Sequence, residues 1–195
     1  MHLNERFSTC CHTENEMTDN RMMSQPGAEI PADDPNRRLA VANPEDRTMR
    51  FISIAGGTYT ILLTGEQTGG RYCLTDMLVP PGGGPPPHRH DFEEMFTILE
   101  GEIEFTFRGE TKKAGAGSTV NIPANAPHSF KNISDTTARL LCMCTPPGQE
   151  LFFLAVGDPV DSRNAPPPKL SPQQQAERIQ RAKALAPQYR TELLV

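Results

Sequence analysis

Three histidines and one glutamate in the middle of the chain have the residue types and the spacing of a metal site. His88 and His90 are two residues apart, so on an extended strand they share a face, with Cα atoms roughly 6 to 7 Å apart. Glu94 follows four residues later, and His128 lies further along the chain. Three imidazoles and one carboxylate suit one divalent ion: Fe(II), Mn(II), Ni(II), Co(II) or Zn(II). The identity of the ion stays open.

The chain has to change direction for these four side chains to meet. Glu94 is too far from His88 and His90 on a straight strand, so we expect a turn within residues 91–93, with Glu94 beginning the next strand. Gly101 then closes that strand, and we expect a hairpin into residues 102–108. His128 belongs to a later strand, so the site requires strands that are distant in the sequence to converge.

Length and composition exclude several classes of protein. The chain has 195 residues and a net charge of −5, with 15 Gly, 19 Pro, 5 Cys and no Trp. The charge argues against nucleic acid or an anionic membrane as partner, and no apolar run reaches the ~18 residues of a membrane span. The N-terminus lacks an apolar signal region, and five cysteines without a CxxC pair fit a reducing compartment. We therefore expect a cytoplasmic, mainly β protein.

Residues 1–50 differ from the rest of the chain. They contain few large apolar side chains, so they bury too little surface to offset the entropy of ordering, and we expect a mostly flexible N-terminal arm. Cys10, Cys11 and His12 are adjacent, but no further ligands follow at the spacing of a zinc finger. We interpret these three residues as part of the arm.

Residues 51–157 are typical of one antiparallel sandwich or barrel. Short β-branched or aromatic runs alternate with Gly- and Pro-rich turns. In EIEFTFR, residues 102–108, Ile103 and Phe105 alternate with acidic residues, as in a strand with one buried face. The expected strands are FISIA, GTYTILLT, RYCLTDMLV, EMFTILE, EIEFTFR, STVNIP, HSFKNI, RLLCMCT and ELFFLAVG.

Residues 158–195 comprise a Pro-rich linker and one expected helix. Ser171 can cap this helix, Pro172 suits its first position and Gln174 completes the spacing of a capping box. Pro187 ends the helical pattern. The apolar stripe is narrow, so we expect the helix to pack on the barrel or on a second subunit.

Two segments of the chain resemble the motifs of the cupin superfamily. The first motif, G-x5-H-x-H-x3,4-E-x6-G, matches from Gly82 to Gly101 at every fixed position. The second, G-x5-P-x-G-x2-H-x3-N, matches from Gly117 to Asn132 except that Asn125 replaces a glycine. Asparagine tolerates positive φ better than other non-glycine residues, so we expect the turn to persist. The resemblance implies a single jelly-roll β-barrel over residues 51–157, with the metal inside.

The chain also resembles single-domain cupins described as quercetin-dioxygenase-like. This resemblance implies a metal-dependent dioxygenase for a small aromatic or enolisable substrate, with Glu94 as both metal ligand and catalytic base. The fold does not determine the reaction. A non-redox lyase, isomerase or cyclase using the same ion is one alternative, and a non-catalytic ligand-binding cupin is another. A homodimer is also possible, because cupins commonly pair their barrels.

Several further side chains near the motifs have a less specific pattern. Four apolar residues are candidates to line the substrate cavity: Phe96, Ile98, Phe105 and Phe130. Packing in the core would explain the same four residues without any role in binding. Glu93 is expected to be a solvated carboxylate, and Arg89 should point away from the metal. Cys142 and Cys144 alternate onto one face and are interpreted as small buried apolar residues rather than ligands or a redox pair.

Overall fold

The computed structural model describes residues 29–195. Residues 36–195 form one unit, and residues 29–35 belong to a second, N-terminal unit. Residues 29–49 contain no helix or strand, as expected for an arm, and its flexibility stays a prediction. Cys10, Cys11 and His12 lie outside the described residues.

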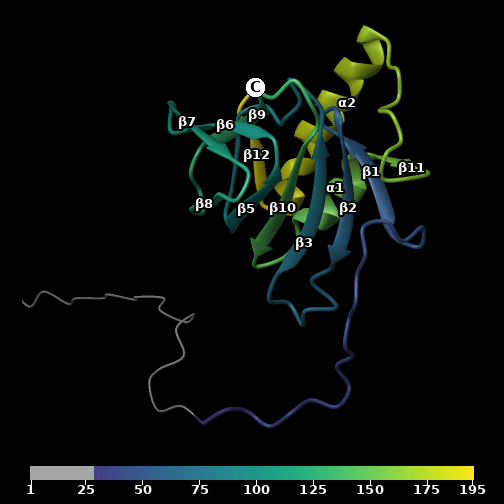
Figure 1. Cartoon of the computed structure of the whole chain (residues 1–195), viewed down its shortest axis with the longest axis vertical. Coiled ribbons are helices and arrows are strands. Elements are labelled where there is room, and N and C mark those ends of the chain that lie inside the picture. Colours follow the sequence, from purple (N-terminus) through teal and green to yellow (C-terminus); the bar gives the residue numbers. More distant parts are fainter. Residues whose placement is uncertain (1–28) are drawn as a thin grey trace, which may run out of the picture. The chain divides into compact units, whose positions relative to one another are not determined.

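The strands of residues 36–195 form two antiparallel sheets (Figure 1). The seven-stranded sheet has the order β11 (Asp158–Val160), β1 (Arg50–Ile54), β2 (Gly57–Leu63), β3 (Cys73–Val79), β10 (Ala138–Thr145), β5 (Glu93–Glu100) and β8 (Thr119–Ile122). The five-stranded sheet has the order β12 (Thr191–Leu193), β4 (His88–His90), β9 (His128–Asn132), β6 (Glu102–Phe107) and β7 (Glu110–Gly115). The prediction of a mainly β jelly roll followed by a C-terminal helix is confirmed.

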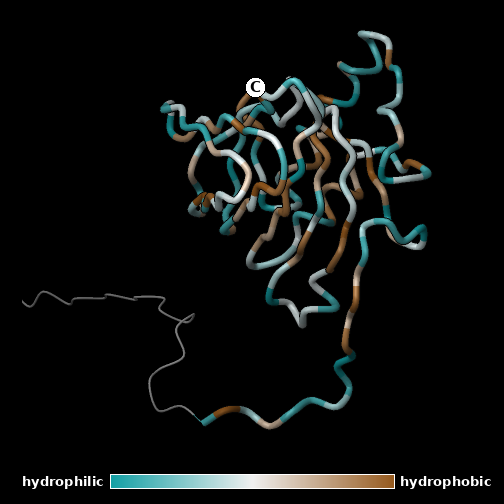
Figure 2. The backbone as a smooth tube through the Cα atoms, viewed as in Figure 1, coloured by the Kyte–Doolittle hydropathy of each residue, from teal (hydrophilic) through white to brown (hydrophobic). Residues whose placement is uncertain are grey.

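The core lies between the two sheets. Phe96 and Ile98 on β5 are buried, as are Ile103 and Phe105 on β6 and Phe130 on β9. The rings of Phe96, Phe105 and Phe130 contact one another, with centroids 5.2 to 5.9 Å apart. Figure 2 shows the same distribution, with hydrophobic residues concentrated on strands and hydrophilic residues in many of the turns. The predicted alternation along β6 is confirmed.

The turn at Gly101 differs from the expectation. Gly101 has a φ of +83°, and a Cβ atom there would lie 2.7 Å from Cβ of Ala138, so only glycine fits without strain. However, β5 and β6 belong to different sheets, so the predicted hairpin is wrong. The turn carries the chain from one sheet to the other, and β6 pairs with β7 and β9 instead.

The segment ELFFLAVG also differs from the expectation, because it forms helix α1 (Gln149–Val156) and not a strand. A short apolar run does not distinguish a strand from a buried helix by periodicity. Neighbouring Phe152 and Phe153 are both buried, which one face of a strand cannot achieve. The Glu150 carboxylate accepts hydrogen bonds from the backbone N–H groups of Gly65 and Gly148 and so ties the start of α1 to the loop after β2.

The C-terminal helix forms as predicted. Helix α2 (Pro172–Leu185) begins at a capping box, in which the Ser171 side chain accepts a hydrogen bond from the Gln174 N–H and the Gln174 side chain accepts one from the Ser171 N–H. A 3-10 helix, η1 (Ala186–Tyr189), continues it into β12. Figure 1 shows α2 in yellow-green beside α1. None of the helices within residues 29–195 is long and apolar enough to cross a membrane.

A buried carboxylate on β3 allows a test of what stabilises the sheet. Asp76 is fully buried and pairs with Arg139 at 2.8 Å and with Arg163 at 2.7 Å. Replacing Asp76 by alanine leaves the partly buried Arg139 guanidinium without this counter-charge and leaves Arg163 only its pair with the exposed Glu45. We therefore expect Asp76→Ala to lower the free energy of unfolding by about 3 kcal/mol. Urea unfolding followed by circular dichroism measures this change.

The matched control removes an exposed ion pair. Arg89 and Glu192 pair at 2.5 Å, but both side chains are about half exposed. Glu192→Ala should lower the free energy of unfolding by less than about 1 kcal/mol, because water screens the pair. Equal losses in the two variants would contradict the assigned role of Asp76.

Candidate metal centre

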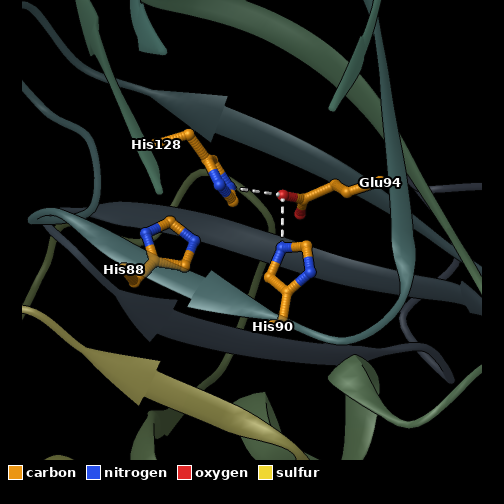
Figure 3. Close-up of side chains that lie close together, drawn as sticks. All are labelled: His88, His90, Glu94 and His128. Atoms are coloured by element: carbon orange, nitrogen blue, oxygen red, sulfur yellow. Dashed lines mark hydrogen bonds and ion pairs between the residues drawn. The ribbon is translucent and has the colours of Figure 1, made fainter. Parts of the chain in front are cut away.

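The four predicted metal ligands come from both sheets and meet in the interior. His88 and His90 lie on β4 and His128 on β9, in the five-stranded sheet, and Glu94 lies on β5 in the seven-stranded sheet. The chain turns between β4 and β5, as expected, and so reverses Glu94 toward the histidines. Figure 3 shows the four side chains pointing toward a common centre. Their ligand atoms all lie within 4.8 Å of one another, and all four residues are buried.

The backbone determines which nitrogen of each imidazole faces the centre. Nδ1 lies 2.9 Å from a backbone carbonyl oxygen in all three rings: that of Pro86 for His88, Phe92 for His90 and Ala126 for His128. A carbonyl oxygen only accepts hydrogen bonds, so each Nδ1 carries a proton. In the neutral ring Nε2 is then an unprotonated lone pair, which is the form that binds a metal.

The resulting arrangement requires a cation. Oε2 of Glu94 lies 3.1 Å from Nε2 of His90 and 3.1 Å from Nε2 of His128. Lone pairs and a carboxylate at this distance repel one another unless a proton or a metal ion lies between them. The chemistry of these donors therefore fits a divalent metal ion, and the cluster is able to hold one.

The pKa values of these groups follow from the same arrangement. Burial raises the pKa of the Glu94 carboxyl, but without a metal ion the hydrogen bonds that protonated His128 and His90 donate to it outweigh burial and hold the pKa well below its usual value. Burial lowers the pKa of His128, and the Glu94 carboxylate more than compensates and raises it. For His88, burial and the charge of His128 lower the pKa to about 4. His88 is thus neutral and able to bind a metal at ordinary pH.

The other carboxylate oxygen of Glu94 has separate partners. Oε1 accepts a hydrogen bond from Nε2 of Gln149 at 2.8 Å, and Sγ of Cys142 lies 3.2 Å away. Sγ of Cys144 donates to Oε1 of Gln149 at 2.7 Å. Burial raises the pKa of both thiols, that of Cys142 to about 12, so they stay protonated. Cys142 and Cys144 are buried, as predicted, but they also contact the site.

The sequence does not identify Gln149 as part of the site, because the pattern of ELFFLAVG predicts a strand there. The side chain of Gln149 is nearly fully buried, and it reaches Glu94 only because α1 begins at Gln149 and packs against β1 and β3, which places this side chain beside Cys144 of β10. A buried glutamine next to two strand cysteines leaves no signature in the sequence, so this contact could not be found without the fold.

A cavity of about 390 Å³ adjoins the cluster, with His88 and Glu94 in its wall. Its remaining lining is mostly apolar and includes Tyr59, Met77, Phe152 and Phe153, with Ile179 and Ala182 contributed by α2. Two of the four predicted lining residues, Phe96 and Phe130, lie in the wall. The other two, Ile98 and Phe105, are buried in the core and are not part of the lining. A second cavity, of about 410 Å³, lies beside Arg139 and Arg163 and contains none of the four ligands.

The charged residues next to the ligands are directed elsewhere. The Glu93 carboxylate accepts hydrogen bonds from the Asn121 side chain at 2.9 Å and from the Ala124 N–H at 3.1 Å. It is therefore anchored to the loop before β9 and is only partly exposed. Arg89 is exposed and pairs with Glu192, as the alternation of β4 requires.

The turn before His128 retains its geometry although asparagine replaces glycine. Asn125 has a φ of +67°, the conformation that asparagine tolerates, and its N–H donates to the carbonyl oxygen of His90 at 2.6 Å. Asn132, the last residue of the motif, donates from Nδ2 to the carbonyl oxygens of Val79 and Thr136. These bonds connect the second motif to β4, to the end of β3 and to the loop before β10.

Comparison with known proteins agrees with this geometry. Residues 75–144 match the cupin domain family. The chain therefore contains a cupin domain. Quercetin 2,3-dioxygenase of Bacillus subtilis (strain 168) is 30% identical over 109 residues, which cover 55% of this chain and 32% of that enzyme.

Two further relatives match shorter stretches of the chain. An uncharacterised protein of Methanocaldococcus jannaschii is 34% identical over 80 residues, covering 40% of this chain and 64% of that protein. Polyketide synthase CurC of Streptomyces cyaneus is 30% identical over 93 residues, which cover 47% of this chain and 60% of that protein. The chain spans less than two thirds of the length of each of these relatives.

Neighbouring carboxylates provide a matched pair of variants for the metal centre. Glu94→Gln removes the charge that faces His90 and His128. Loss of a residue that only supports a metal ligand already lowers metal affinity by about tenfold or more, so we expect the affinity of Glu94→Gln for Co(II) to fall by at least about tenfold. Glu93→Gln should bind Co(II) like the wild type. Titration calorimetry measures both affinities, and equal affinity in the two variants would refute Glu94 as a ligand.

Proposed function

We propose that this protein is a cytoplasmic, metal-dependent oxidoreductase, a dioxygenase that acts on a small aromatic or enolisable compound. The observation that carries the proposal is the buried three-histidine, one-glutamate cluster in the wall of an apolar cavity of about 390 Å³. This volume lies within the range of small-molecule sites. The similarity to quercetin 2,3-dioxygenase supports the same class of substrate.

The cavity supplies the binding energy and orients the substrate. Phe96 and Phe130 form part of the wall near the ligands, and Phe152 and Phe153 extend it along α1. Aromatic walls pack against a planar ring and exclude water. An aromatic substrate is thereby placed with its polar atoms toward His88 and Glu94, the strongly polar end of the site.

Proton transfer is assigned to Glu94. When bound, a divalent ion supplies Lewis-acid chemistry that favours the anionic form of an enol or phenol and can support reaction with oxygen. Glu94 is placed to accept the substrate proton at the lone pair of Oε2 that a bound ion would not use, because Oε2 faces the histidines and Oε1 is occupied by Gln149. The three histidines hold their orientation through the carbonyl groups bonded at Nδ1.

A second candidate function is a non-redox cyclase, lyase or isomerase. The similarity to polyketide synthase CurC favours it, because a site that stabilises an enolate also serves ring closure without oxygen. The two functions share the metal and the cavity and differ only in their need for oxygen. The expected homodimer remains a prediction, which sedimentation of the full chain tests.

Oxygen uptake distinguishes these functions. The protein loaded separately with Fe(II), Mn(II), Co(II), Ni(II) or Zn(II) is mixed with a panel of flavonols, catechols and 1,3-diketones. We expect at least one metal to support consumption of one oxygen molecule per substrate converted, because a dioxygenase incorporates both atoms. His128→Ala is the control and should show no uptake. Conversion under anaerobic conditions would support the cyclase class instead, and binding without any product would refute both.

The cavity itself is tested by two alanines on α2. Ala182 lines the cavity, whereas Ala184 on the same helix is exposed. Ala182→Trp should lower kcat/KM by about tenfold or more, since a misfit in a tight pocket costs that much or more, and it should leave the metal content unchanged. Ala184→Trp should have no effect on either quantity. If both variants had wild-type kinetics, the cavity would not be the substrate site.

A further inference from the structure

The two oxygens of the Glu94 carboxylate have different surroundings. Oε2 lies 3.1 Å from Nε2 of both His90 and His128. Oε1 accepts a hydrogen bond from Gln149 at 2.8 Å, with the Cys142 thiol 3.2 Å away. One oxygen therefore faces the metal-binding space, and the other is held by donors that come from α1 and β10.

We propose that Gln149, supported by Cys142, is a positioning residue that keeps Oε1 of Glu94 bonded to the protein and so restricts Glu94 to metal coordination through Oε2. The inference rests on the proposed function only in requiring a bound metal ion, and it does not depend on oxygen chemistry. It assigns a role to a residue outside both cupin motifs.

The orientation of the Gln149 amide follows from its partners. A carboxylate only accepts hydrogen bonds, so the NH₂ group of Gln149 faces Glu94 and the carbonyl oxygen faces away. That oxygen lies 2.7 Å from Sγ of Cys144 and 3.5 Å from Sγ of Cys142, and thiols can donate to it. The Cys142 thiol has one proton, which the shorter contact assigns to Glu94, so the amide bridges the carboxylate and Cys144. The opposite orientation would place two acceptors together.

The backbone of Gln149 is fixed as firmly as its side chain. Gln149 is the first residue of α1, and it is followed by the buried Glu150, whose carboxylate accepts from the N–H groups of Gly65 and Gly148. Gln149 itself is only 5% exposed. The donor is therefore held by the start of α1 as well as by the contacts of its own side chain.

These contacts have a consequence for coordination. A carboxylate oxygen that accepts two hydrogen bonds has less electron density to offer a cation, and bidentate binding would require both bonds to break. Coordination through Oε2 alone uses one position of the ion instead of two. An additional position then remains for substrate, which is the benefit that Gln149 provides.

Two glutamine-to-methionine variants test the inference. Gln149→Met keeps the length and approximate volume of the side chain but removes the donor, whereas Gln180→Met changes an exposed glutamine on α2. The full-length proteins are titrated with Co(II) alone. We expect Gln149→Met to bind Co(II) about tenfold more weakly, as is usual for a lost outer partner of a metal ligand, and to show an altered visible Co(II) absorption spectrum. Gln180→Met should match the wild type in both.

The outcomes separate this inference from the proposed function. Unchanged Co(II) affinity and spectrum in a folded Gln149→Met protein would overturn the inference alone. If Gln149→Met does not fold, Cys142→Ala decides: we expect about threefold weaker binding for one lost donor, and no change would overturn the inference. A wild type that binds Co(II) but neither consumes oxygen nor converts substrate would overturn only the proposed function. A wild type that binds no Co(II) would overturn both.

Discussion

One carboxylate and three imidazole lone pairs are buried in the same small volume inside this protein, and their repulsion has to be balanced by a cation. Each histidine is held at Nδ1 by a backbone carbonyl group, so it cannot turn its lone pair away from Glu94. Much of the nearby structure serves this constraint. The turn between β4 and β5 directs Glu94 inward, and β9 places His128 beside His88.

The two sheets contribute different parts of the site. The five-stranded sheet supplies the imidazoles, and the seven-stranded sheet supplies the carboxylate and, through Cys142 and Cys144 on β10, its surroundings. A metal ion at this position would therefore connect the sheets across the core. The C-terminal segment completes the arrangement: β12 pairs with β4, with Thr191 opposite His90, and α2 forms part of the cavity wall.

His88, His90 and Glu94 could be predicted as neighbours from local rules, whereas His128 was added by the spacing of the second motif. Two histidines at a spacing of two share a face of any strand, and Glu94 can reach the same point only if the chain turns between His90 and Glu94. The capping box at Ser171 is equally local. The persistence of the turn at Asn125 could also be predicted, since the φ of that residue is set by the turn and not by distant contacts.

What could not be predicted depends on which strands become neighbours. The turn at Gly101 could have made a hairpin, and only the packing of the whole chain places β5 and β6 in separate sheets. The sequence of residues 149–156 fits a strand and a helix equally well. The contact of Gln149 with Glu94 depends on the helix, so it could not be predicted either. Ile98 has the same parity as Phe96 on β5, but the cavity ends before it, so only Phe96 reaches the lining.

X-ray absorption spectroscopy of the protein purified without added metal tests the central claim most directly. We predict one divalent ion per chain, surrounded only by nitrogen and oxygen neighbours at about 2.0 to 2.2 Å, with the outer-shell scattering of three imidazole rings. A protein that retains no ion even after incubation with each candidate metal would contradict the account. So would an ion bound to sulfur, because it would place the metal at Cys142 and Cys144 instead of between His88, His90, His128 and Oε2 of Glu94.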